Sequence, residues 1–173
     1  MSQASLITNS AARARGLAQA LLKDVDPQRA ARLAQGANGP IDANHPTFVY
    51  GHLSLYHPML ITMLGQDPGD AAVPDTYDAL FNRTAQCIDD PDASKYPPLE
   101  EVVEHFMRGS EAAQNAVSNA SDEAFATPTP NEKYRAIFPT VGDMANFLLN
   151  DHVMFHLGQV STWRRCEGLG HAM

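Results

Sequence analysis

Apolar residues recur along this chain at the three- and four-residue spacing of amphipathic helices, and clusters of glycine, proline and asparagine separate the periodic stretches. The first stretch covers residues 5–25 and ends before Pro27. Its apolar positions share a face that spans roughly 100°: Leu6, Ile7, Ala14, Leu17, Leu21 and Val25. The pattern predicts a long helix, followed by a short turn of helix at residues 29–33.

A second helix is predicted from Pro46 or Thr47 to Leu64, where Gly65 ends it. Pro58 lies inside this stretch. Proline has no backbone N–H, and its ring crowds the preceding turn of a helix. We therefore expect the second helix to bend, or to lose part of its hydrogen-bond ladder, near this proline.

Residues 66–98 are predicted to be mostly irregular, because prolines and glycines interrupt this part of the chain repeatedly. A short helix is expected around residues 77–82. Long connections of this kind tend to carry function or to cover a site. A third helix is predicted from about residue 98 to residue 119, where Glu100 and Glu101 suit the positive N-terminus of a helix.

The last helix is predicted from Thr140 to about Glu167, after a linker at residues 121–131. Thr140 is the expected N-cap, and Asp143 stands at the third helical position, so the two are typical of a capping box with Asp in place of Glu. No segment has the alternation of a strand, and no repeat of fixed period is found. Four long helices with a long irregular connection between the second and third predict an all-α four-helix bundle, in a single domain over residues 1–173.

The net charge changes the picture by excluding partners. Twelve Lys and Arg against 20 Asp and Glu give a formal charge of −8, which is the wrong sign for binding nucleic acid or an anionic membrane. No run approaches the ~18 apolar residues of a membrane span, and no secretory signal is found, so a cytoplasmic protein is expected. Cys87 and Cys166 are far apart in unlike contexts, which predicts two free thiols.

The most informative feature is a pair of histidines four residues apart in the last helix, His152 and His156. At about 100° per residue their rings differ by roughly 40° around the helix, so both lie on one face, one turn apart. An apolar stripe predicted to be buried shares this face: Val141, Ala145, Leu148, Leu149, Phe155 and Trp163. Buried imidazole nitrogens need partners, and a metal ion is one of the few partners that satisfies two rings together.

A third ligand is expected, since a site that binds metal tightly and keeps an open position usually has three protein ligands. His52 shares its face of the second helix with Phe48, Val49, Leu55, Tyr56, Met59 and Met63. His57 is about 140° away from it and is predicted to point outward. His105 lies at the margin of an apolar face, where an exposed or surface-paired ring is expected. His45 and His171 are predicted to be solvated.

These observations select His52, His152 and His156 as candidate ligands of one divalent metal ion. The competing interpretation is that they are hydrogen-bonded structural residues, which is the commoner role for a single histidine facing a core. Three histidines on two inward faces favour the metal site.

Other motifs exclude several kinds of metal chemistry. Val153 stands where zinc proteases of the H-E-x-x-H type carry their general base. The spacing from Glu101 to His105 is one residue too long for the Glu-x-x-His element of di-iron bundles. No glycine-rich phosphate loop and no G-x-S-x-G motif is present.

Several segments, which together span nearly the whole chain, resemble the DinB-like bundle superfamily, which also includes bacterial thiol S-transferases. The three-histidine pattern is the most specific part of this resemblance. The segments that carry it are Phe48-Val49-Tyr50-Gly51-His52-Leu53, Tyr96-Pro97-Pro98-Leu99-Glu100-Glu101, Pro128-Thr129-Pro130-Asn131-Glu132, Thr140-Val141-Gly142 and Asn150-Asp151-His152-Val153-Met154-Phe155-His156-Leu157-Gly158-Gln159.

The resemblance implies a four-helix bundle that holds a divalent metal, commonly zinc or nickel, through one histidine of the second helix and two of the fourth. Those positions are His52, His152 and His156 here. Several members of the superfamily look like metal-dependent transferases or isomerases that activate a low-molecular-weight thiol such as bacillithiol or mycothiol, and many others have no assigned activity. The fold transfers from such a likeness more readily than the reaction does.

The leading hypothesis is an enzyme whose metal offers its open position to a thiolate or a water, either for transfer of a low-molecular-weight thiol to an electrophilic small molecule or for hydrolysis. Tyr56 and Gln159 are candidates to orient the bound group; packing is the alternative role for each. The second hypothesis is a non-catalytic, stress-associated bundle that the metal stabilises. A bundle with an empty histidine cluster is the third.

A homodimer is also predicted, because Phe147, Met154 and Leu157 form a second apolar group on the side of the last helix opposite its histidines. The alternative is that the long loops cover these residues.

Overall fold

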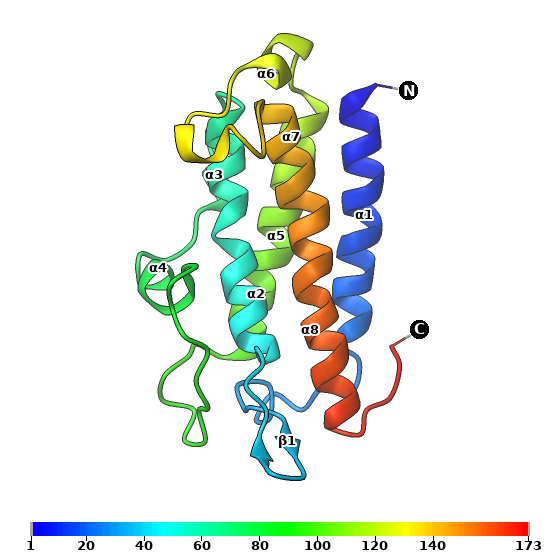
Figure 1. Ribbon diagram of the computed structural model, residues 1–173, viewed down its shortest axis with the longest axis vertical. Coiled ribbons are helices and arrows are strands. Elements are labelled where there is room, and N and C mark those ends of the chain that lie inside the picture. The colour runs from blue at the N-terminus through cyan, green and yellow to red at the C-terminus, as the bar shows by residue number, and fades with distance from the viewer. Residues whose placement is uncertain (1, 173) are drawn as a thin grey trace.

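The computed structural model describes residues 2–172, which are mostly helical, and this confirms the all-α prediction. Helical segments lie side by side along the longest axis of the molecule (Figure 1). They are α1 (Gln3–Leu21), α2 (Pro46–Ser54) followed by α3 (Tyr56–Met63), α5 (Leu99–Ser118), and α7 (Val141–Asn146) followed by the π-helix η3 (Phe147–Asp151) and α8 (His152–Cys166). The helix α5 packs against α1, α2 and α3, and α8 packs against α1 and α2.

The first helix is displaced from its predicted limits at both ends. It begins where the Ser2 side chain accepts a hydrogen bond from the Ser5 backbone N–H, and it ends at Leu21 rather than near residue 25. Asp24 has a φ of 60°, a left-handed conformation that a helix does not continue through. Leu6, which was predicted on the buried face, is 56% exposed.

The second helix breaks as the proline predicted. Leu55 separates α2 from α3, and its backbone N–H donates to the His52 carbonyl in a tighter turn than that of an α-helix. The break overturns the outward orientation predicted for His57, since that angle assumed one continuous helix. His57 is 1% exposed. Its ring packs closely against Gly109 of α5, where a Cβ would lie only 2.8 Å from the Nδ1 atom of His57.

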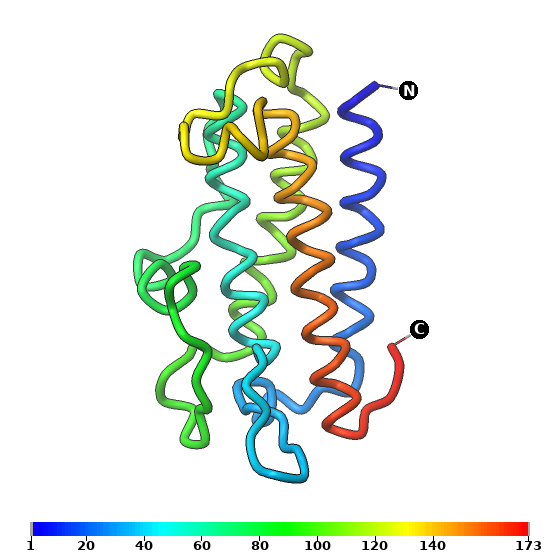
Figure 2. The backbone as a smooth tube through the Cα atoms, in the orientation of Figure 1, coloured from blue at the N-terminus to red at the C-terminus, as the bar shows by residue number. Residues whose placement is uncertain are grey.

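The connections contain short elements, and Figure 2 shows how they loop at the two ends and along one side of the bundle. The predicted short helix is present as α4 (Thr76–Phe81), whereas residues 29–33 form hydrogen-bonded turns in place of the expected helical turn. Elements not predicted are a two-residue hairpin of β1 (Gln35–Gly36) with β2 (Gly39–Pro40), the helices η1 (Gly69–Ala71) and η2 (Glu132–Tyr134), and α6 (Asp122–Ala126).

The fourth helical segment starts with the predicted capping box. Thr140 Oγ1 accepts from the Asp143 N–H at 3.2 Å, and the Asp143 carboxylate accepts from the Thr140 N–H at 3.0 Å. The π-helix η3 then interrupts it, which was not predicted. An extra residue in a turn rotates the chain that follows by about 100° relative to a regular α-helix. As a result Phe155 is 67% exposed, although it was predicted to be buried.

A buried arginine joins the ends of two helices near the C-terminus. The Arg164 guanidinium donates to the carbonyls of Leu21 and Lys23 at the end of α1, and to the carbonyl of Leu169 after α8. A positive charge is favourable at these carbonyl-rich helix ends. Cys87 and Cys166 are both free, as predicted. No helix within residues 2–172 combines the length and apolar character that crossing a membrane requires.

Candidate metal centre

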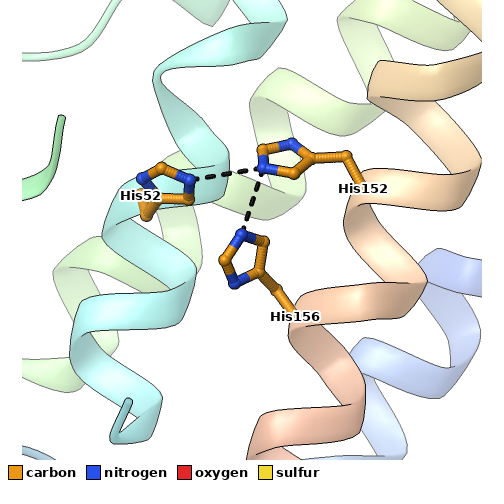
Figure 3. Close-up of side chains that lie close together, drawn as sticks. All are labelled: His52, His152 and His156. Carbon is orange, nitrogen blue, oxygen red and sulfur yellow. Dashed lines mark hydrogen bonds between the residues drawn. The ribbon is translucent and has the colours of Figure 1, made fainter. Parts of the chain in front are cut away.

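Three histidines from two helical segments converge, as the sequence predicted (Figure 3). His52 comes from α2, and His152 and His156 come from α8. The Nε2 atom of His152 lies 3.3 Å from Nε2 of His52 and 3.1 Å from Nε2 of His156. One ring nitrogen from each residue therefore falls within a sphere small enough for a single ion to contact all three.

His52 is oriented from behind by the long connection. Its Nδ1 lies 2.6 Å from the backbone carbonyl oxygen of Phe81, the last residue of α4, so Nδ1 carries the proton that this oxygen accepts. Phe48 stacks on the His52 ring with an interplanar angle of 7°. These contacts leave the lone pair on Nε2, which points at the other two histidines.

His156 is oriented in the same way by a side chain. Its Nδ1 lies 2.8 Å from Gln159 Oε1, and that oxygen also accepts from Asn44 Nδ2 at 3.1 Å. The sequence suggested Gln159 as a residue that orients a metal-bound group. The structure instead places its carbonyl oxygen at Nδ1, behind the ring and away from the Nε2 cluster.

His152 differs from the other two. It is the first residue of α8, directly after the π-helix, and Phe147 stacks on its ring while the edge of Tyr56 approaches it at 4.7 Å between centroids. Its Nδ1 is buried and has no hydrogen-bond partner among the described residues. Aromatic packing, rather than a hydrogen bond, therefore sets the orientation of this ring.

Burial keeps the three rings neutral at pH 7. It lowers the pKa of His152 to about 3, with further lowering from His156 and His52. It also lowers the pKa of His156 to about 4, although the hydrogen bond that His156 donates to Gln159 acts in the opposite direction. Burial also lowers the pKa of His52, again against the hydrogen bond to Phe81. Neutral imidazole is the form that binds metal, so these rings need not lose a proton to become ligands.

The hydrogen bonds show that a cation fits this cluster. Because Nδ1 carries the proton in both His52 and His156, their Nε2 atoms are acceptors only. A single proton on Nε2 of His152 could serve just one of its two neighbours, whereas a metal ion would accept all three lone pairs. No fourth His, Cys, Asp or Glu among residues 2–172 joins the group, which is the ligand count of a site with an open position.

Two of the remaining histidines behave as predicted. His105 is half-buried and its Nδ1 lies 2.8 Å from Arg108 Nη2, a surface pairing, and His171 is exposed. The prediction that His45 is solvated is wrong, because it is fully buried beneath the long connection. Its Nδ1 accepts from the Phe48 N–H and caps α2, and its Nε2 lies 3.2 Å from the Ile88 carbonyl.

Tyr56 lies at the edge of the cluster. Its ring centroid is 5.0 Å from that of His52 and 4.7 Å from that of His152. Burial raises the pKa of its phenol, so the hydroxyl keeps its proton at neutral pH. That hydroxyl makes no hydrogen bond to another described residue, and the side chain is half-buried.

A family model of the DinB superfamily matches residues 10–160, which include the three histidines. The chain therefore belongs to the DinB superfamily. No curated protein and no solved structure matches the chain significantly.

Proposed function

We propose that His52, His152 and His156 bind one divalent metal ion, zinc or nickel, through their Nε2 atoms. The observation that carries this proposal is the convergence of three neutral imidazoles whose tautomers leave lone pairs facing one another. Three protein ligands leave a coordination position for a water or a substrate atom. Membership of the DinB superfamily supports the same conclusion.

We further propose that this DinB-superfamily protein transfers a low-molecular-weight thiol to an electrophilic small molecule. A bound divalent ion would lower the pKa of a coordinating thiol, so that the thiolate forms at neutral pH. The chain supplies the surroundings: Phe48 and Phe147 shield the histidine rings, and the unpaired Tyr56 hydroxyl can donate a hydrogen bond to a bound substrate. The resemblance to thiol S-transferases supports this reaction.

Two alternatives use the same three ligands. A metal-bound water in place of the thiol would make the protein a hydrolase. A non-catalytic, stress-associated bundle is supported by one observation: two of the surface hollows lie along α1 and the fourth helical segment, and the histidines line neither of these two. A small molecule that reaches the metal and changes its spectrum would favour an enzyme.

Metal content is the first test. We expect one zinc or nickel ion per chain in protein purified without an affinity tag, and a loss of that ion on replacing His52, His152 or His156 with Ala. Elemental analysis measures the stoichiometry, and His105→Ala is the matched control because His105 is paired at the surface. Three single variants that retain metal as well as the parent protein would rule out the site.

Turnover is the second test. Zinc- and nickel-loaded protein should transfer thiols such as bacillithiol or glutathione to haloaromatic or epoxide electrophiles, with a hydrolase panel run in parallel. His152→Ala separates metal-dependent turnover from the background reactivity of the thiol. If the loaded protein never exceeds that variant in either panel, the non-catalytic alternative replaces the enzyme.

Any homodimer would need a different surface from the one predicted. Leu157 is fully buried and Phe147 packs on Phe138 and His152, so of the three predicted residues only Met154 is substantially exposed, at 47%. The rotation at η3 accounts for this difference. We propose that self-association instead uses the hollow between α1 and α8 that Met154 lines together with Leu17.

A further inference from the structure

The side chains of Asn44 and Gln159 form an amide pair that contacts the metal site only through His156. We infer that this pair positions His156 for metal binding, an inference that rests on the metal site proposed above. Gln159 lies on α8, one turn after His156, and Asn44 lies in the loop before α2, next to the residue that caps that helix. The pair thus connects the two helical segments that supply the ligands.

The chemistry of the two amides fixes the tautomer of His156. Gln159 Oε1 can only accept a hydrogen bond, so the proton of the neutral ring must stand on Nδ1 and the lone pair on Nε2. The Asn44 NH2 group can only donate, and it donates to the same oxygen at 3.1 Å. If the Gln159 amide turned over, its own NH2 group would face that of Asn44. With its NH2 group facing Gln159, Asn44 therefore favours the orientation in which the oxygen of Gln159, and not the nitrogen, contacts the His156 ring.

The three ligands differ in how they are held, which makes this contact testable. The backbone carbonyl of Phe81 orients His52, so no side-chain substitution removes that acceptor directly. His152 has no hydrogen-bond partner at Nδ1 within residues 2–172. Among residues 2–172, Gln159 is the one side chain that accepts a hydrogen bond from a histidine of the cluster at Nδ1. Removing such a partner typically costs 10–100-fold in metal affinity, because the free ring samples other orientations and its Nε2 becomes less basic.

The experiment compares four variants loaded with Co²⁺, whose affinity is measured by competition with a chromophoric chelator. Gln159→Met removes the acceptor at similar size, and we expect about 10–100-fold weaker binding. Gln159→Glu keeps an acceptor and should retain the parental affinity or exceed it. Asn44→Leu leaves the Gln159 oxygen in place without its anchor, so its loss should be smaller than that of Gln159→Met.

The matched control is Gln66→Met. Gln66 is also half-buried and donates one hydrogen bond, from Nε2 to the Ala116 carbonyl, but it lies outside the histidine cluster. We expect this variant to bind Co²⁺ as the parent does. Circular dichroism of the metal-free proteins checks that each variant folds. If Gln159→Met does not fold, the Co²⁺ affinity of Asn44→Leu tests whether the amide pair positions His156.

A spectroscopic signal separates positioning from a merely structural role. In the NMR spectrum of the Co²⁺ protein, the exchangeable Nδ1–H of each ligand histidine should give a strongly shifted resonance. Gln159→Met should broaden or remove the His156 resonance, and Gln159→Glu should restore it. Parental affinity and an unchanged resonance in Gln159→Met would overturn the inference while the metal site stands. A parent protein that binds no Co²⁺ would overturn the proposed site, and the inference with it.

Discussion

Burial alone does not distinguish the three clustered histidines from the structural histidines of this molecule. His45 and His57 are more deeply buried than His152, yet neither belongs to the cluster. The Nδ1 of His45 accepts from a backbone N–H and its Nε2 meets a carbonyl oxygen, so both of its ring nitrogens have protein partners. In His52 and His156 of the cluster, only Nδ1 has such a partner and Nε2 faces the other histidines. The division of partners between the two nitrogens therefore distinguishes His45 from His52 and His156.

The buried His45 should make stability depend on pH. Burial lowers its pKa from 6.5 to about 4, so between these values the unfolded chain binds a proton that the folded chain does not. Stability is then fully present above pH 6.5 and falls as the pH falls towards 4. The contribution of this one ring is on the order of 3 kcal/mol.

The measurement is urea unfolding of metal-free protein across this pH range, compared with His45→Asn. Asn also caps a helix well but does not titrate, so the difference between the two proteins isolates His45 from the other histidines. We expect the parent protein to lose more stability on acidification than the variant. Parallel curves for the two proteins would contradict the assignment.

At the scale of elements, the π-helix η3 is the main feature that the sequence pattern did not predict, because the pattern was interpreted as one regular helix. In α7 and the first turn of η3 the buried residues include Val141, Ala145 and Leu148, and in α8 they include Val153, Leu157 and Val160. On a single straight helix these two stripes would be offset by roughly 120°, because each residue advances by about 100°. The offset is visible in the sequence, but the choice of a regular helix assigned Phe155 to the core and Leu157 to the surface.

The convergence of the three histidines was nevertheless predictable. His152 and His156 both follow η3, so the rotation moves them together and the angle between their side chains around the helix is unchanged. His52 precedes the break at Leu55, so it keeps the face that its neighbours predict. His57 follows the break and was predicted on the wrong side. For these histidines, periodicity thus holds within an uninterrupted helical segment and fails across an interruption.

Gly51 allows the long connection to reach the metal site. A Cβ at this position would lie 2.6 Å from the Phe81 ring, and Phe81 is fully buried among other aromatic side chains, so its ring has little room to move. We expect Gly51→Ala to destabilise the protein by about 1–3 kcal/mol through overpacking. It should also weaken metal binding, because it pushes away the residue whose carbonyl orients His52.

Gly158→Ala is the matched control for this prediction. Gly158 lies on the exposed side of α8 near His156, and a Cβ there would meet nothing within 4 Å. Alanine favours a helix over glycine, so this variant should be more stable by up to ~1 kcal/mol and should bind metal normally. Chemical unfolding and metal competition measure both effects. A Gly51→Ala protein as stable as the parent would show that α4 can withdraw without cost.

At the scale of the whole molecule, the connections supply what periodicity could not predict. The acceptor for His52 is the Phe81 carbonyl, and the buried Nε2 of His45 meets the Ile88 carbonyl, both in the long connection. Every residue has a backbone carbonyl group, so such a contact does not require a particular amino acid at that position and cannot be recognised from the sequence. The sequence could indicate that a long irregular segment covers a site, but only the fold shows which of its backbone atoms reach the histidines.

The arrangement of α1 beside the fourth helical segment carries the last prediction, which is self-association. A hollow of about 660 Å3 between these segments is lined by Met154 and Leu17, with Arg13 and Asp151 also in its lining. A patch that holds both charges can face its own copy across a two-fold axis with opposite charges paired. We therefore expect a homodimer at micromolar concentrations.

Met154→Glu should convert the homodimer to a monomer, because it places a carboxylate in the apolar part of the contact. Ile88→Glu is the control and should leave the mass unchanged, since Ile88 is similarly exposed but lies outside the hollow. Sedimentation velocity distinguishes the two species. A parent protein that sediments only as a monomer would contradict self-association through the hollow. A dimer that persists in Met154→Glu would show that the contact lies on another face.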